Sequence, residues 1–108
     1  MKLRVARWEG PGAPTAEALK ERLRAARCSA VEWSDPPGRT YDAHTHEHDE
    51  VIALLGGGIT FDIGGVDYPL APGDILFLPA GTLHAAQAHP GEGATYLIGS
   101  RAKSKGKP

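Results

Sequence analysis

The chain has 108 residues, a formal net charge of −1 and 41% hydrophobic residues, which fits one ordinary globular domain. The near-neutral charge gives no general attraction for nucleic acid or an acidic membrane surface, and no apolar stretch approaches the roughly 20 residues of a membrane span. A single cysteine, Cys28, excludes an internal disulfide. Charges throughout residues 1–10 leave no apolar signal-peptide core, so the expected location is the cytoplasm.

The N-terminal part, residues 1–28, is expected to form a strand and a helix that pack on the rest of the protein. Residues 2–8 alternate loosely and predict a strand, either at a sheet edge or lent to a partner chain. The segment from Thr15 to Arg27 predicts the one helix, because Thr15 can cap it and Leu19 and Leu23 recur at helical spacing. Its other side is charged, which is typical of a packing helix without a chemical role.

Residues 29–100 have a sequence pattern typical of a β-barrel, with short apolar runs separated by glycine and proline. Gly64-Gly65 is typical of a two-residue hairpin, and Pro72-Gly73 of a tight turn. Short strands without intervening helices predict an all-β, antiparallel sandwich or barrel. The predicted strands are residues 30–34, 51–55, 59–63, 66–70, 75–78 and 95–99.

Two compositional features leave alternatives open. Residues 101–108 hold four basic residues and no apolar anchor beyond Ala102, which predicts a disordered basic tail rather than an arm for nucleic acid. Asparagine is absent and glutamine occurs once, a depletion that heat-adapted proteins show. Compositional drift in a chain rich in alanine and glycine produces the same depletion.

Three histidines and one glutamate have the spacing of a metal site. His44 and His46 are one residue apart, so on a strand their imidazoles point to the same face. Glu50 follows a polar turn and returns to that face, while His84 enters from another strand after the turn at residues 79–81. Three imidazoles and one carboxylate suit a divalent first-row metal (Fe, Mn, Ni, Co, Zn or Cu), and an octahedral ion would keep two positions open. A closed structural zinc site usually recruits cysteines.

The spacing of these residues resembles the two sequence motifs of the cupin superfamily, in particular its small single-domain members. The first motif is similar to Gly38-x5-His44-x-His46-x3-Glu50-x6-Gly57, and the second to Gly73-x5-Pro79-x-Gly81-x2-His84. The resemblance covers residues 38–88. One position departs from the pattern, since Ala88 stands where the second motif usually ends in asparagine.

The resemblance implies a fold, a ligand set and an assembly. The fold is an antiparallel jelly-roll, or double-stranded β-helix, barrel with the metal near its centre. The implied metal ligands are His44, His46, Glu50 and His84, and the asparagine replaced by Ala88 is not a ligand in the family pattern. Dimerisation through N-terminal strands is frequent in the family, so a homodimer is expected.

The residues around the ligands indicate a small apolar cavity. Ala86 and Ala88 share the parity of His84, and Ile52 and Leu54 that of Glu50. His48 is either a fifth ligand or an exposed turn residue, and His89 is interpreted as a loop histidine. Five aromatic residues are expected mostly in the core, with one or two at a substrate mouth: Trp33, Tyr41, Phe61, Phe77 and Tyr96. No ionisable residue other than Glu50 is expected inside the barrel.

Two functions follow from this interpretation. The first is a metal-dependent enzyme, oxygenase-like or isomerase-like, in which a small oxygenated molecule takes the open positions and the ion acts as Lewis acid or oxygen binder. Glu50 is then the candidate catalytic base, if it detaches from the ion. The alternative is a metal-dependent module that binds or senses a small molecule without turnover. Fold alone does not separate them.

Overall fold

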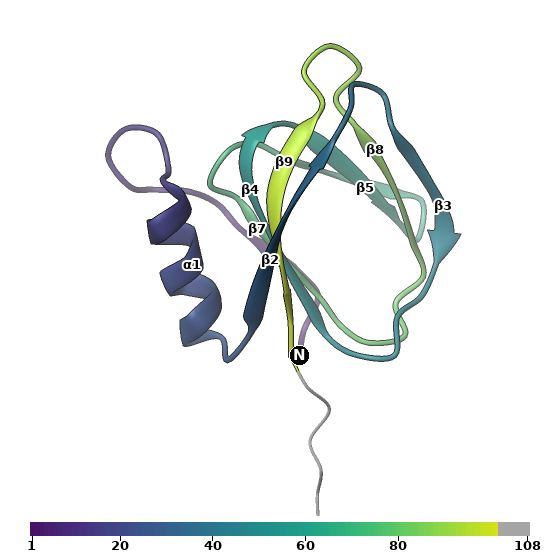
Figure 1. The fold of residues 1–108 in the computed structure, drawn as a ribbon. Helices are drawn as coiled ribbons and strands as arrows, with labels where there is room; N and C mark the ends of the chain where they lie inside the picture. Colours follow the sequence, from purple (N-terminus) through teal and green to yellow (C-terminus); the bar gives the residue numbers. More distant parts are fainter. Residues whose placement is uncertain (102–108) are drawn as a thin grey trace, which may run out of the picture.

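The structure, a computed structural model, describes residues 1–101 as two antiparallel β-sheets that face each other, with one helix on the outside (Figure 1). This helix is neither long nor apolar enough to cross a membrane. The elements within these residues are β1 (Arg4–Ala6), α1 (Ala16–Ala25), β2 (Ser29–Asp35), β3 (Thr40–His44), β4 (Glu50–Gly57), β5 (Ile59–Ile63), β6 (Val66–Leu70), β7 (Ile75–Leu78), β8 (His84–Ala88) and β9 (Ala94–Ser100).

The two sheets share the strands in jelly-roll fashion. One sheet has the order β1-β7-β4-β9-β2 and the other the order β3-β8-β5-β6. From β6 to β9 each successive strand lies in the opposite sheet, so side chains from both sheets fill the space between them. The all-β prediction of an antiparallel jelly-roll barrel with one N-terminal helix is confirmed.

The predicted strands agree with the structure best where glycines define the turns. The strands at residues 59–63 and 66–70 have the predicted bounds, because Gly64 and Gly65 both adopt the positive φ that their hairpin requires. β2, β4 and β9 extend one or two residues beyond the prediction at one or both ends. β3 and β8 were not among the predicted runs. The predicted tail is residues 101–108, and residues 102–108 of it lie outside the described residues.

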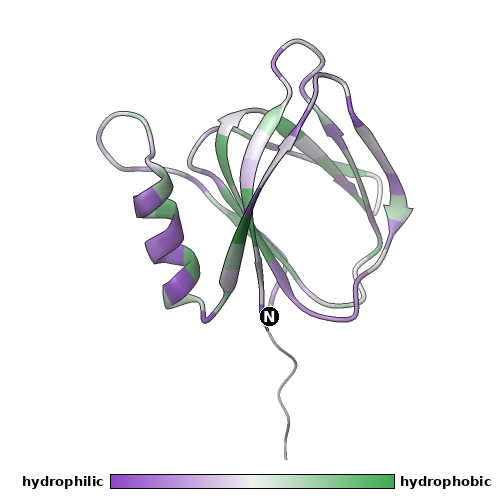
Figure 2. Ribbon diagram, viewed as in Figure 1, coloured by the Kyte–Doolittle hydropathy of each residue, from purple (hydrophilic) through white to green (hydrophobic). Residues whose placement is uncertain are grey.

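Helix α1 packs its apolar side on the outer face of the five-stranded sheet, and its charged side faces away (Figure 2). The Thr15 hydroxyl accepts a hydrogen bond from the Ala18 N–H at 3.1 Å, which caps the helix as predicted. Leu19 and Leu23 are fully buried against Val51 and Leu97. The helix ends at Ala25, two residues earlier than predicted.

Removal of one of these leucines tests how much the packing of α1 on the sheet contributes to the stability of the fold. Leu23→Ala should lower the free energy of unfolding by about 3 kcal/mol, because it deletes fully buried methyl groups and leaves a cavity between helix and sheet. Urea denaturation measures the change. Leu83→Ala, at a residue that is 60% exposed, is the matched control and should change the stability by less than about 0.5 kcal/mol. Equal losses in the two variants would contradict the packing described.

The N-terminal strand β1 pairs with β7 of the same chain, at the edge of the five-stranded sheet. Asp74 is buried and fixes the chain after β1, accepting hydrogen bonds from the Arg7 guanidinium at 2.6 Å and the Trp8 N–H at 3.1 Å. Gly73 lies beneath Trp8 with φ +95°, and a Cβ there would lie 2.3 Å from the Trp8 side chain. Within this chain, β1 is the edge strand of its sheet.

Candidate metal centre

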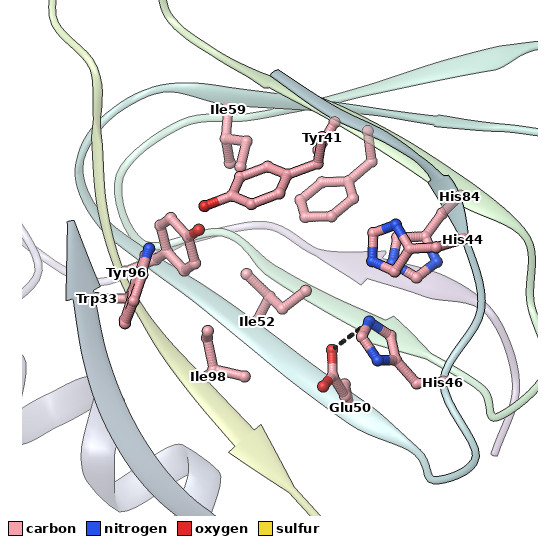
Figure 3. A pocket seen from close by; sticks show the side chains of 12 residues that line it. Trp33, Tyr41, His44, His46, Glu50, Ile52, Ile59, His84, Tyr96 and Ile98 are labelled. Carbon is pink, nitrogen blue, oxygen red and sulfur yellow. Dashed lines mark ion pairs between the residues drawn. The ribbon is translucent and has the colours of Figure 1, made fainter. Parts of the chain in front are cut away.

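A pocket of about 270 Å³ opens between the two sheets, with histidines at one end and aromatic side chains at the other (Figure 3). The predicted parity is confirmed for Ile52 and Ala86, which line the pocket, while Leu54 and Ala88 lie fully buried in the core. The walls between the two ends are largely apolar. The lining residues are Trp33, Tyr41, His44, His46, Glu50, Ile52, Ile59, Phe61, His84, Ala86, Tyr96 and Ile98.

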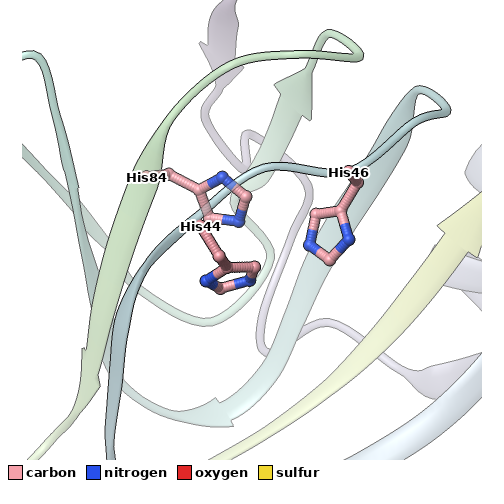
Figure 4. Close-up of side chains that lie close together, drawn as sticks. All are labelled: His44, His46 and His84. Carbon is pink, nitrogen blue, oxygen red and sulfur yellow. The ribbon is translucent and has the colours of Figure 1, made fainter.

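Three of the predicted ligands, His44, His46 and His84, come together at this pocket (Figure 4). His44 ends β3 and His84 begins β8, and the two residues are opposite each other in the pairing of these strands. One ring nitrogen from each of the three histidines lies within 4.8 Å of the others. The centroids of the His44 and His84 rings are 4.4 Å apart. Segments 40 residues apart in sequence thus deliver convergent nitrogen donors.

The hydrogen bonds of two of these rings determine which nitrogen is free. The Nδ1 of His44 lies 2.6 Å from the Asp42 carbonyl oxygen, and that of His84 lies 2.9 Å from the Thr82 carbonyl oxygen. A carbonyl only accepts, so each Nδ1 carries the proton and each Nε2 keeps its lone pair. Burial, aided by His44 and His46, lowers the pKa of His84 and favours the neutral ring that binds metals.

His46 is placed beside the other two histidines by a loop contact and not by the alternation of side chains along a strand. The spacing of His44 and His46 predicts that both lie on one strand, but β3 ends at His44. The carbonyl of His46 instead accepts a hydrogen bond from the Gly81 N–H at 2.8 Å. This bond joins the segment after β3 to the turn before β8, and so holds His46 beside His84.

Glu50 lines the same pocket but stands at the edge of the histidine group. It begins β4, and its Oε1 lies 3.6 Å from the Nε2 of His46 (Figure 3). Its Oε2 lies 3.4 Å from the Nε2 of His48, whose side chain is 40% exposed. His89 lies outside this pocket, and its Nδ1 accepts hydrogen bonds from the N–H groups of Gly91 and Glu92.

The donor set fits a divalent transition metal. Neutral imidazole nitrogens with free lone pairs bind such ions at 2.0–2.1 Å, so neighbouring donors on one ion lie about 3.0–3.4 Å apart. The observed separations of up to 4.8 Å reach that spacing if each donor atom moves inward by about 1 Å. The carboxylate of Glu50 supplies a charged oxygen at the same wall.

Behind the opposite end of the pocket lies a buried ionisable group that the sequence did not predict. Asp35 ends β2 and is 5% exposed, so the prediction that only Glu50 is ionisable inside the barrel was wrong. Its Oδ1 accepts hydrogen bonds from the Tyr41 hydroxyl at 2.6 Å and the Trp33 indole N–H at 3.0 Å. Its Oδ2 accepts one from the Tyr96 hydroxyl at 2.6 Å. We call these four residues the Asp35 cluster.

The Asp35 cluster escaped prediction because its members come from three strands. Asp35 stands before Pro36-Pro37-Gly38, where the sequence reads as the start of a turn, and its partner Tyr96 is 61 residues away. Burial raises the pKa of Tyr96, and the hydrogen bond to Asp35 raises it further. The phenol therefore keeps its proton. One or two aromatic side chains were expected at the pocket, and the structure has four: Trp33, Tyr41, Phe61 and Tyr96.

Comparison with known proteins identifies the family. Residues 31–98 match the family model Cupin_2, described as a cupin domain, and the chain therefore belongs to the cupin family. No curated protein matches the chain.

Solved structures agree with this assignment. A cupin-like protein from Thermotoga maritima is 20% identical with a TM-score of 0.63, covering 68% of this chain and 56% of its own. The DMSP lyase DddQ from Ruegeria pomeroyi is 27% identical with a TM-score of 0.63, covering 74% and 41%. YcfD, a ribosomal oxygenase from Escherichia coli in complex with cobalt and succinic acid, is 25% identical with a TM-score of 0.67, covering 82% and 28%. The chain thus spans about half or less of the length of these proteins.

Proposed function

We propose that this chain is a mononuclear-metal enzyme, oxygenase-like or isomerase-like, that acts on a small oxygenated molecule. The observation that carries the proposal is the wall where His44, His46 and His84 converge beside Glu50 on a largely apolar pocket. Apolar pockets with a few convergent polar groups are the usual place for ligand chemistry. A volume of about 270 Å³ is small for such a pocket, which favours a small substrate.

In this proposal each residue has a defined part. His44, His46 and His84 hold the ion through Nε2, and Glu50 supplies a fourth, charged ligand. When bound, the divalent ion supplies Lewis acidity and positions for substrate oxygen atoms. Three neutral imidazoles and one carboxylate give this end of the pocket a net charge of about +1 with the ion present, by the formal charges of these groups. Ile52, Phe61 and Ala86 exclude water from the neighbouring wall.

The compared structures support enzymatic chemistry without fixing the reaction. One is named a lyase and another an oxygenase, and the latter was solved with cobalt and succinic acid. A metal and a small carboxylate are thus held by a protein of similar fold. The Asp35 cluster adds a second polar group at the pocket, where Tyr41 and Tyr96 are among the lining residues.

The test is turnover by protein loaded separately with Fe(II), Mn(II), Ni(II) and Zn(II). Diols, catechol-type compounds and sugar-type compounds are supplied, and oxygen uptake and product formation are followed. The proposal expects product with at least one metal and none with the metal-free chain. Ligand-dependent thermal shifts without product from any metal form would instead favour the binding module.

A single substitution tests the part assigned to Glu50. Glu50→Gln should weaken metal binding roughly 10- to 100-fold, because the neutral amide removes the one charged ligand. Isothermal titration of the metal-free protein with Zn(II) measures the affinity. Glu47→Gln, at an exposed position three residues earlier, is the control and should leave the affinity unchanged. Unaltered Zn(II) affinity together with lost turnover would show that Glu50 is a base and not a ligand.

A further inference from the structure

The Asp35 cluster stands at the end of the pocket remote from the histidines. Figure 3 shows the hydroxyl oxygens of Tyr41 and Tyr96 near each other at this end, with the three imidazoles at the other. Asp35 does not itself line the pocket, whereas Trp33, Tyr41 and Tyr96 do. A molecule in the pocket would therefore meet the tyrosines first, with the Asp35 carboxylate behind them.

The hydrogen bonds within the cluster decide what it offers to a ligand. Each tyrosine hydroxyl has one proton, and Asp35 accepts both. The indole proton of Trp33 is directed to Asp35 as well. The two phenol oxygens are left with lone pairs only, and among residues 1–101 no lysine or arginine lines the pocket. This end thus accepts hydrogen bonds and donates none.

The two ends of the pocket therefore have opposite character. The histidine end, with a divalent ion and Glu50, attracts oxygen atoms that carry negative charge. The Asp35 end attracts N–H and O–H groups and repels anions, because its oxygens have no protons to share. The apolar walls between them, which include Ile52, Ile59 and Ile98, suit a short hydrocarbon segment.

We propose that the Asp35 cluster is the second half of the ligand site and selects molecules that carry a hydroxyl or ammonium group at the end opposite their metal-binding oxygens. The substrate class is then a short ω-hydroxy or ω-amino acid, or a compound of the same polarity. This inference rests on the proposed function for the metal end. The competing explanation is that the cluster only ties β2, β3 and β9 together.

A set of matched compounds tests the selection. The probes are 4-hydroxybutyrate, 4-aminobutyrate, pentanoate and glutarate, which share a carboxylate and a three-carbon spacer and end in hydroxyl, ammonium, methyl and carboxylate. Calorimetry with the Co(II)-loaded chain should find the first two roughly 5-fold or more tighter than pentanoate, and glutarate the weakest. The same series with one carbon fewer and one more covers the unknown span between the two ends.

Asp35→Asn separates selection from a purely structural role. Its amide oxygen would keep the bonds from Trp33 and Tyr41, so its NH2 group would face Tyr96 and turn the Tyr96 proton toward the pocket. The preference for the hydroxyl and ammonium ends should then fall to within about 2-fold, while glutarate gains affinity. Asp67→Asn, at an exposed residue outside the pocket, is the control and should preserve the original order.

The outcomes distinguish this proposal from the proposed function. If Co(II) binds stoichiometrically and pentanoate binds as tightly as the hydroxyl- and ammonium-ended compounds, or no compound binds, the selection is overturned and the metal centre stands. If Co(II) does not bind, the proposed function fails. The order of affinity is then measured on the metal-free chain by the change in tryptophan fluorescence, and lack of any preference overturns the selection too. If Asp35→Asn fails to fold, the order in the unsubstituted chain decides.

Discussion

His84→Ala is expected to reduce the affinity for a divalent ion by at least two orders of magnitude. The substitution removes one of three converging imidazoles, and even the loss of a residue that only orients a ligand typically costs 10- to 100-fold. His84 is 3% exposed and its Nδ1 is held by the Thr82 carbonyl, so its imidazole has a fixed place in the wall of the pocket. Metal content per folded chain after dialysis, measured by elemental analysis, reports the loss.

The matched control for this loss is His89→Ala. His89 bonds to the N–H groups of Gly91 and Glu92 in its own loop, outside the pocket, so its removal should leave the metal content unchanged even if the loop loosens. Equal metal content in the His84 variant and the unsubstituted chain would refute the assignment. A parallel loss in both variants would show that the metal is bound elsewhere or adventitiously.

Asp35→Ala is expected to lower the free energy of unfolding by about 3 kcal/mol or more. The change leaves three hydrogen-bond donors without an acceptor, on Trp33, Tyr41 and Tyr96, and each buried donor left unsatisfied costs about 1–3 kcal/mol. Water in the pocket can satisfy part of this demand, since Trp33 is 48% exposed. The total loss of stability for the three donors is therefore expected near the lower end, at about 1 kcal/mol for each.

Urea denaturation of the metal-free chain measures this second effect. Asp67→Ala removes a carboxylate from an exposed position and should change the stability by less than about 0.5 kcal/mol. Asp35→Asn should cost less than Asp35→Ala, because the amide retains an acceptor for Trp33 and Tyr41. A loss below about 1 kcal/mol in Asp35→Ala would mean that the cluster does not hold β2, β3 and β9 together.

The sequence predicted the elements whose determinants are local. The hairpin between β5 and β6 has the predicted bounds because two glycines with positive φ fix its turn. The sequences of β3 and β8 contain no comparable local signal. The pairing of β3 with β8 shifts register between Tyr41 and His44, and β8 has the sequence His-Ala-Ala-Gln-Ala, which shows little of the β-branched and aromatic enrichment typical of strands.

The two halves of the pocket differ in the same way. The spacing of His44, His46 and His84 can be recognised in the sequence, and the structure brings these three residues together. The Asp35 cluster depends on contacts between residues up to 61 positions apart, which one sequence does not reveal.

The homodimer stays a prediction, which sedimentation of the full chain checks.

The most direct test of the metal centre is anomalous X-ray diffraction from crystals grown with Co(II) or Zn(II). We expect one strong peak per chain, about 2.1 Å from the Nε2 atoms of His44, His46 and His84, with a Glu50 oxygen completing the set. A peak elsewhere, or no peak in crystals of protein that retains the metal in solution, would contradict the assignment.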